Sequence, residues 1–224
     1  MIEFVSIILG FIFGIIASAI ATLMIDYGTK PLLKIFQDDS PIRAQGQNPN
    51  HPPHEFYHLK VSNVSARWPL PGRRPAWACK ATIEVFDING TTRVIPEIII
   101  ARWPSQPEPL LPTFNSGHVT NILDPARVLM AQRYDVHNHD NPLLDIAIKY
   151  EGNQDCYIFS NESYLYQMWQ NPNWRLNNGT YKLKIILYYE RGPKEFIFRL
   201  RNAGNTRNDL SLEIVDLRKE RLNS

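Results

Sequence analysis

Histidine is the residue type in this chain most suited to binding a metal, and five of the six histidines fall in two short groups. His51, His54 and His58 form the first group, and His137 and His139 form the second. Zinc requires three or four ligands held in a tetrahedral arrangement, and these spacings match no standard zinc pattern. We therefore favour surface or structural histidines over a metal site, and we predict no metal and no cofactor.

The motifs of the common enzyme classes are absent from the sequence. It contains no H-E-x-x-H, no G-x-S-x-G, no phosphate-binding glycine loop and no dinucleotide fingerprint. Carboxylates such as Asp145 and Glu151 are expected to be solvated residues at strand edges. Cys79 lies on an apolar strand face, which is typical of an inert buried thiol. We predict a non-enzymatic protein, with a membrane-attached hydrolase built from scattered residues as an alternative.

Aromatic and basic side chains gather in Pro-rich segments around the first predicted hairpins. Trp, Tyr and Arg dominate binding hot spots, so these positions are the predicted contact site for a protein partner or an anionic small molecule: Trp68, Arg73, Arg74, Trp77, Arg102 and Trp103. Arg73 and Arg74 are also suited to accept a phosphate from a nucleotide or lipid. A second aromatic group comprises Tyr164, Tyr166, Trp169 and Trp174. The alternative interpretation is that the aromatics close the ends of the fold and the arginines are solvated.

An apolar segment near the N-terminus is expected to hold these residues at a membrane. Residues 4–25 contain 17 apolar residues and no charge, and as a helix they would span roughly 33 Å, against a bilayer core of about 30 Å. A cleaved signal peptide is the competing interpretation, because residues 17–19 (ASA) resemble a cleavage site. The segment lacks a basic region before it, which favours a retained anchor.

The charges flanking this segment predict its orientation. Lys30, Lys34 and Arg43 follow it, and no Lys or Arg precedes it. The positive-inside rule therefore places the C-terminal part in the cytoplasm. Four N-x-[ST] sequons, at Asn63, Asn89, Asn161 and Asn178, argue weakly for the opposite side.

One face of the predicted membrane helix consists of small residues. Gly10, Gly14, Ser18 and Thr22 recur every four residues. Such a face lets two membrane helices approach closely, so these positions are predicted to mediate self-association.

The remainder of the chain reads as an all-β fold. Residues 56–62, 76–86, 92–103, 129–136, 143–150, 156–159, 179–189 and 195–201 are predicted strands, and residues 104–127 a long surface connection. Residues 33–36 are either a first strand or a segment resting on headgroups, and residues 210–215 either a strand or the start of a helix. We predict an immunoglobulin-like β-sandwich, or a small barrel, behind one transmembrane helix. The expected organisation is an anchor at 1–28, a juxtamembrane linker at 29–54, the sandwich at 55–216 and a tail at 217–224.

Several of these segments resemble known proteins. The apolar helix, residues 30–35 (KPLLKI) and residues 57–63 (YHLKVSN) together resemble small, mostly uncharacterised prokaryotic single-pass membrane proteins. Residues 179–185 (GTYKLKI) are similar to the late strand of immunoglobulin-like sandwiches, in which a Tyr after Gly packs at a corner. The chain departs from antibody domains, since no Cys follows Tyr181 two residues later.

Composition limits the remaining possibilities. An apolar share of 44% is enough for a packed core, and a net charge of +2 is too balanced to indicate binding of a nucleic acid polymer. Two cysteines, Cys79 and Cys156, are too few for a disulfide scaffold but could form one disulfide bond.

Taken together, these features predict a function at the membrane. We predict a cell-membrane scaffold whose cytoplasmic β-domain binds protein partners or itself beside the lipid bilayer. A nucleotide-sensing, ligand-gated membrane effector, as in bacterial defence, is the main alternative.

Overall fold

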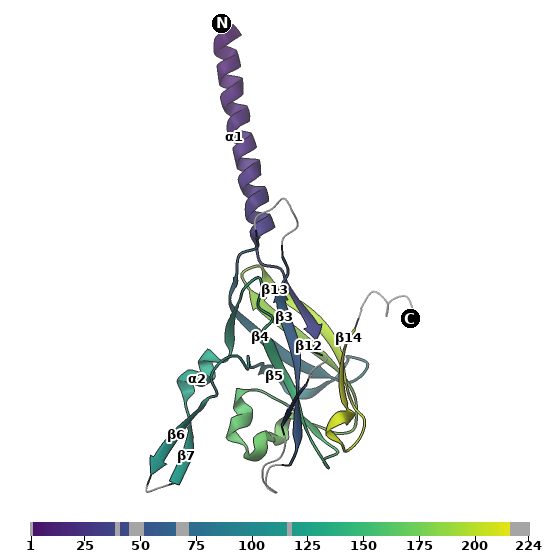
Figure 1. Ribbon diagram of the computed structural model, residues 1–224. Coiled ribbons are helices and arrows are strands. Elements are labelled where there is room, and N and C mark those ends of the chain that lie inside the picture. The colour runs from purple at the N-terminus through teal and green to yellow at the C-terminus, as the bar shows by residue number, and fades with distance from the viewer. Residues whose placement is uncertain (1, 39–40, 45–51, 66–71, 116–117, 216–224) are drawn as a thin grey trace.

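A computed structural model describes all residues except 1, 39–40, 45–51, 66–71, 116–117 and 216–224 (Figure 1). One long helix, α1 (Ile2–Thr29), projects from two stacked sheets. Residues Leu9–Thr29 are long and apolar enough to cross a membrane, and the sandwich contacts only the last turn of the helix. This confirms the predicted class of an all-β fold with one N-terminal apolar helix.

The first sheet brings together strands from the start and the middle of the chain. In spatial order it contains β1 (Leu33–Gln37), β3 (His54–Asn63), β9 (Leu143–Tyr150), β10 (Cys156–Ile158) and β11 (Arg175–Leu176). The short strand β2 (Ile42–Ala44) also pairs with β3. All of these pairings are antiparallel.

The second sheet contains the longest strands. Its order is β14 (Leu210–Ile214), β13 (Gly192–Asn202), β12 (Gly179–Tyr189), β4 (Ala76–Phe86) and β5 (Arg93–Ile100), and β8 (Arg133–Val136) pairs with β4. Pro96 lies on β5 at the edge of this order, and the β4–β5 register shifts, as the proline predicts. Gly192, at φ 94°, begins β13 after the turn that closes the β12–β13 hairpin.

Alternating apolar residues on the two sheets face each other and form the core. On β4 the alternating residues Cys79, Ala81, Ile83 and Val85 are fully buried. Strands β12, β13, β3 and β9 add further buried residues to the same cluster: Leu183, Ile185, Leu187, Phe198, Leu200, Leu59, Val61, Leu144 and Ile146. The described residues therefore form a two-layer sandwich.

The outer face of the first sheet is covered as well. Residues 160–174 form three short 3₁₀ turns, η1 (Asn161–Leu165), η2 (Gln167–Trp169) and η3 (Pro172–Trp174). Their side chains pack against β3, β9 and β10 and form a second hydrophobic cluster. This cluster contains Ile148, Tyr150, Tyr157, Phe159, Phe56, Tyr164, Met168 and Trp169. Strand β9 is therefore buried on both faces.

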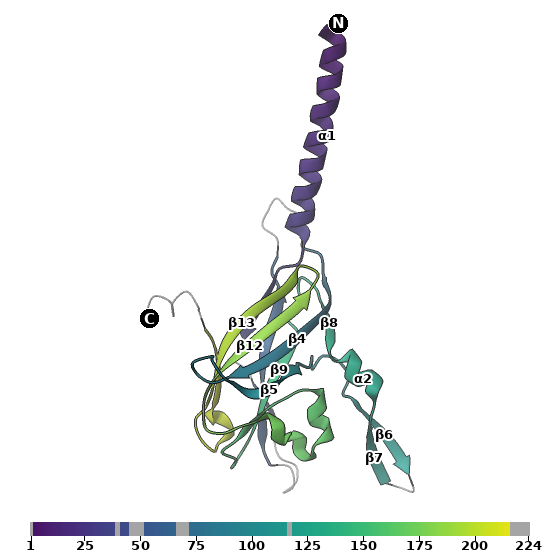
Figure 2. The ribbon, with the colours of Figure 1, turned by 180° about the vertical axis from the view of Figure 1, so that it is seen from behind.

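The region predicted as a long surface connection has structure of its own. It forms a hairpin of β6 (Leu110–Asn115) and β7 (His118–Leu123), followed by helix α2 (Pro125–Met130). The strand predicted at 129–136 is therefore wrong in its first half, and β8 begins only at Arg133. The Asp124 carboxylate accepts a hydrogen bond from the Ala126 amide, and Pro125 occupies the first turn, a usual start for a helix. We call β6, β7 and α2 together the arm, which projects from the sandwich (Figure 2).

The sandwich also begins earlier than the predicted boundary at residue 55. Strands β1 and β2 lie within the segment expected to be a linker, and Leu33 and Ile35 are buried in the core. Residues 33–37 are thus a strand, which resolves the first open alternative. Likewise Leu210–Ile214 pairs with β13 as a strand and is not the start of a helix.

Candidate functional site

A buried group of charged side chains forms where β3 and β9 run side by side. His58 on β3 pairs in register with Asp145 on β9, next to a register shift between Tyr57 and His58. Arg102 follows the end of β5, and its carbonyl accepts a hydrogen bond from the Asp145 amide (3.0 Å). Segments far apart in the sequence thus bring three ionisable residues together.

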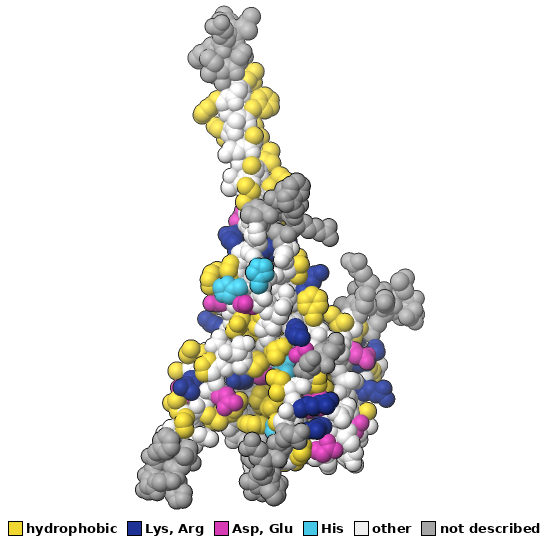
Figure 3. Space-filling model, viewed as in Figure 1, with side chains coloured by type: hydrophobic (Ala, Val, Ile, Leu, Met, Phe, Trp, Pro, Cys, Tyr) yellow, Lys and Arg dark blue, Asp and Glu magenta, His cyan; other side chains and the backbone are white. Residues whose placement is uncertain are grey.

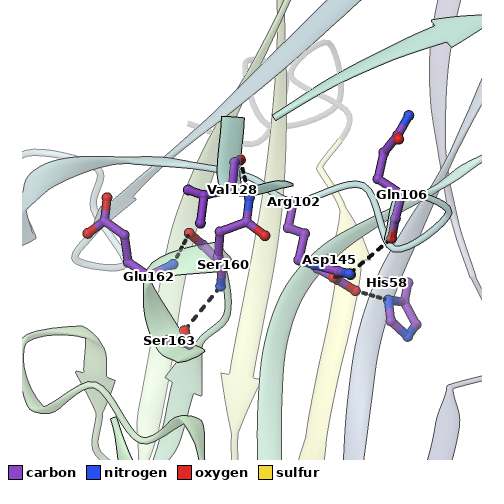
Figure 4. A network of polar contacts seen from close by, with 9 residues as sticks. His58, Arg102, Gln106, Val128, Asp145, Ser160, Glu162 and Ser163 are labelled. Atoms are coloured by element: carbon purple, nitrogen blue, oxygen red, sulfur yellow. Dashed lines mark hydrogen bonds and ion pairs between the residues drawn. The ribbon is translucent and has the colours of Figure 1, made fainter. Parts of the chain in front are cut away.

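Asp145 lies between the other two residues (Figure 4). Its Oδ1 is 2.7 Å from His58 Nδ1, and its Oδ2 is 3.1 Å from Arg102 Nη1. The side chains of all three are at most 4% exposed. The short contact places a proton on His58 Nδ1, which faces the carboxylate. Among the described residues, no hydrogen-bond partner reaches His58 Nε2 or Arg102 Nε.

A cavity of about 220 Å³ adjoins this group. Its walls combine the three polar residues with aromatic rings, and the lining residues are Ile42, Phe56, His58, Arg102, Pro104, Glu108, Asp145, Phe159, Tyr164 and Trp169. The Arg102 guanidinium lies 5.7 Å from the centre of the Tyr164 ring. Burial raises the pKa of the Tyr164 hydroxyl to about 12, against an opposing effect of Arg102. The cavity is therefore a mostly apolar site with a few convergent polar groups, the usual form of a small-molecule site.

Hydrogen bonds hold the segment that covers this cavity. Ser160 caps η1, since its Oγ accepts from the Glu162 amide and its own amide donates to Ser163 Oγ. The Asn161 side chain donates to the carbonyl of Val128 in the arm (3.0 Å), so the cover and the arm are linked (Figure 4).

The backbone of the cover is strained next to the cavity. Met168 and Trp169 have positive φ angles of 54° and 57°, and the Tyr150 hydroxyl donates to the Met168 carbonyl. Such conformations cost of order 1–3 kcal/mol each and tend to occur at ligand-binding sites.

The cavity combines an Asp–His pair with aromatic walls. An Asp–His pair can act as a general base, and the described lining residues include no Ser, Thr or Cys. The charges of Arg102 and Asp145 cancel, and the rings offer flat apolar surfaces. A small ligand with a planar group would fit these walls.

Two of the six predicted contact residues lie at the junction between α1 and the sandwich. Arg73 Nη1 donates to the carbonyls of Gly28 (3.2 Å) and Lys30 (2.7 Å). Arg74 Nη2 lies 2.6 Å from a carboxylate oxygen of Asp26. These arginines bind the end of the helix to the fold.

The other predicted contact residues are dispersed. Trp77 is 55% exposed beside His137, whereas Trp103 is fully buried and stacks on Tyr134. Arg102 lies in the buried group described above, and Trp68 lies outside the described residues. The structure therefore does not bring the predicted set together on one surface.

Sequence reasoning missed the part played by Asp145. It was expected to be solvated, but it is 2% exposed. The available signal was its position inside the apolar run Leu143–Tyr150 of β9, where a carboxylate needs a partner. His58, considered only as a metal ligand, is that carboxylate's partner.

The histidine groups, cysteines and small-residue face can also be placed. Within the described part of the chain, no three His, Cys, Asp or Glu side chains are grouped to hold a metal ion; His51 lies outside that part. Cys79 and Cys156 are free and buried, so the disulfide that the sequence left open is absent.

The small-residue face of α1 has no partner within the described chain. Open space surrounds Gly10 and Gly14, while Thr22 Oγ1 donates to the Ser18 carbonyl. Self-association through this face stays a prediction.

Comparisons with known proteins give no relative for this chain. No family model, no curated protein sequence and no solved structure matches it.

Proposed function

We propose that this protein is a membrane-anchored, non-enzymatic scaffold whose cytoplasmic β-domain binds protein partners through the arm. The observation that carries the proposal is the exposure of apolar side chains on this projecting element. Ile122 is 53% exposed, Leu129 65% and Met130 56%, and α2 has no buried residue. Exposed apolar groups on a projecting element are typical of a contact surface.

A groove next to α2 supports the same interpretation. It has a volume of about 530 Å³ and is lined by Ala78, Gln106, Leu129, Met130, Gln132, Arg133, Tyr134 and Asp135. It joins the exposed end of α2 to β8 and β4, so a partner can contact the arm and the sandwich together. Anchoring in the membrane would raise the effective concentration of this surface for membrane-bound partners.

The cytoplasmic orientation rests on charge. Lys30 and Lys34 follow the helix, which the positive-inside rule favours for the cytoplasmic side. Asn63 and Asn161 are at most 2% exposed, and their side-chain amides donate to backbone carbonyls. A glycan on either residue would be incompatible with this packing, whereas Asn89 and Asn178 are exposed, so the proposed orientation rests on the flanking charges.

Introducing charge on the arm tests the partner-binding proposal. We expect the Leu129→Glu/Met130→Glu variant to lose at least tenfold in the yield of photo-crosslinked partner from cells, because apolar contact area is replaced by carboxylates. Leu165→Glu/Ile214→Glu is the matched control, since these residues are 62% and 54% exposed elsewhere on the sandwich. Equal yields from both variants would exclude the arm as the binding surface.

A ligand-gated membrane effector is the second candidate, and the aromatic rings of the cavity support it because they offer flat surfaces on which a nucleotide base can stack. In this alternative an anionic small molecule such as a nucleotide binds the β-domain, and the small-residue face of α1 reassembles in the bilayer. Nucleotide-dependent oligomerisation of the full chain, lost in Trp169→Ala, would support it over the scaffold.

We further propose that the sandwich is immunoglobulin-like, on the basis of one hydrogen bond at the start of β12. The Tyr181 hydroxyl donates to the Asn177 carbonyl four residues upstream (3.0 Å). This bond resembles the tyrosine corner of immunoglobulin-like domains, in which the hydroxyl bonds back to nearby backbone.

A further inference from the structure

The end of the sandwich that meets α1 is held firmly against the helix. The Arg74 amide donates to the Thr29 carbonyl (2.7 Å), in addition to the Arg73 and Arg74 contacts described above. Asn138 Nδ2 donates to the Arg73 carbonyl, and Asn63 Nδ2 donates to the Arg74 carbonyl. The strands cannot turn freely about the helix, so one fixed surface of the sandwich faces the bilayer.

The turn of the β12–β13 hairpin reaches the same place. The Arg191 guanidinium lies 5.0 Å from the centre of the Tyr27 ring on the last turn of α1. Lys194 Nζ donates to the carbonyl of Leu33 (2.8 Å), the first residue of β1. Two cations from late in the chain are therefore added to those that follow the helix in sequence.

Most of these cations lack a carboxylate partner. Asp26 is 3.1 Å from Lys30 Nζ and 2.6 Å from Arg74 Nη2, so these two charges are compensated. No carboxylate within ion-pair distance is recorded, among the described residues, for the remaining four: Lys34, Arg73, Arg191 and Lys194.

The local environment makes an anion favourable here. Burial lowers the pKa of the Lys194 ammonium, and the neighbouring charges of Lys34 and Arg191 lower it further. Glu195, which follows Lys194 in sequence, pairs instead with Lys184 (3.2 Å), and among the described residues Glu190 forms no ion pair with these cations. An anion placed between these cations would relieve it.

An exposed aromatic ring lies beside these cations. Tyr27, on the last turn of α1, is 67% exposed and contacts Arg191. Tyr and Trp are enriched at the interface between a membrane and water. Figure 3 shows Lys and Arg side chains where the helix meets the sandwich.

We infer that this end of the sandwich is a docking surface for anionic lipid headgroups, with Lys34, Arg191 and Lys194 binding the phosphates and Tyr27 lying at the headgroup level. We call these three cations the collar. The collar fixes the sandwich at the membrane surface and thereby sets the direction in which the arm projects. It depends on the anchor but not on the arm or on any protein partner.

Lipid retention by the full-length chain tests the inference. The detergent-solubilised protein is titrated with phosphatidylglycerol or with phosphatidylcholine of the same acyl chains, and bound lipids are counted by native mass spectrometry. We expect retention of the anionic lipid in clear excess. Each cation near an anionic surface contributes roughly 1 kcal/mol, so Lys34→Gln/Arg191→Gln should lower the preference about 30-fold.

The control carries the same change of charge at the far end of the sandwich. Arg175→Gln/Arg201→Gln removes two exposed cations there, and we expect it to retain the wild-type preference. Equal retention of the two lipids, or an equal loss in both variants, would overturn the inference. The arm variant Leu129→Glu/Met130→Glu should keep the lipid preference, which separates this test from that of the proposed function.

Discussion

Replacing Asp145 with Asn is expected to lower the free energy of unfolding by about 3–5 kcal/mol. The substitution preserves shape but removes the charge that Arg102 and His58 share, at 3.1 and 2.7 Å. Arg102 is 4% exposed, so its guanidinium would be left buried without a counter-charge. Chemical denaturation of the full chain in mild detergent, followed by circular dichroism, measures the loss.

Two further variants isolate the cause. Asp155→Asn makes the same change in a more exposed pair, where Arg175 is 56% exposed and 3.7 Å away, and should cost less than about 1 kcal/mol. Asp145→Leu/Arg102→Met replaces the buried pair with apolar groups and should be the more stable of the two Asp145 variants. A loss for Asp145→Asn no larger than that for Asp155→Asn would show that the buried group does not stabilise the fold.

Alkaline pH is expected to destabilise the protein through its two buried thiols. Burial raises the pKa of Cys79 and of Cys156 from 9.0 to about 12, so each thiol stays protonated in the fold after it would ionise in the unfolded chain. The free energy of unfolding is therefore unaffected by the ionisation of these thiols below pH 9. It falls as the pH rises from 9 to 12, because the thiols ionise in the unfolded chain but not in the fold. At about 1.4 kcal/mol per unit for each thiol, the loss by pH 12 is about 4 kcal/mol per cysteine.

The pH dependence of a cysteine-free variant tests this assignment. Cys79→Ala/Cys156→Ala should lower stability by a constant amount below pH 9, because small cavities form, and should flatten the fall between pH 9 and 12. Tyrosines such as Tyr164 titrate in both proteins and cancel in the difference. Parallel curves for the two proteins across this pH range would contradict the role of the thiols.

The strands of the sandwich could be predicted because their signals are local. Alternation on β4 and β12 placed the core residues correctly, and the turn at residues 87–92 follows from its Asp, Asn and Gly. The arm was missed because its prolines, Pro109, Pro112 and Pro125, suggest an irregular connection. The Asp124–Pro125 pair is the local feature of this region that favours a helix start, because Asp caps the first turn and Pro occupies it.

The candidate site could not be predicted because it depends on strand register. His58 and Asp145 are far apart in the chain and meet only through the β3–β9 pairing. Arg73 and Arg74 are predicted from the sequence as contact residues for a partner or an anion. In the structure they bind the end of α1, a contact that the sequence does not indicate. Sequence can flag a buried carboxylate or a pair of arginines, whereas the partner of each is set by the tertiary fold.

Labelling of single cysteines in intact bacterial cells tests the central claim that α1 anchors a cytoplasmic sandwich. The native thiols are buried and remain protonated at neutral pH, so they stay unreactive. New cysteines are introduced at exposed Asn89 and at Ile2, at the other end of the chain's apolar helix. With a membrane-impermeant maleimide, we predict that Ile2→Cys is labelled in intact cells and Asn89→Cys only after lysis. Labelling of Asn89→Cys in intact cells would contradict the account.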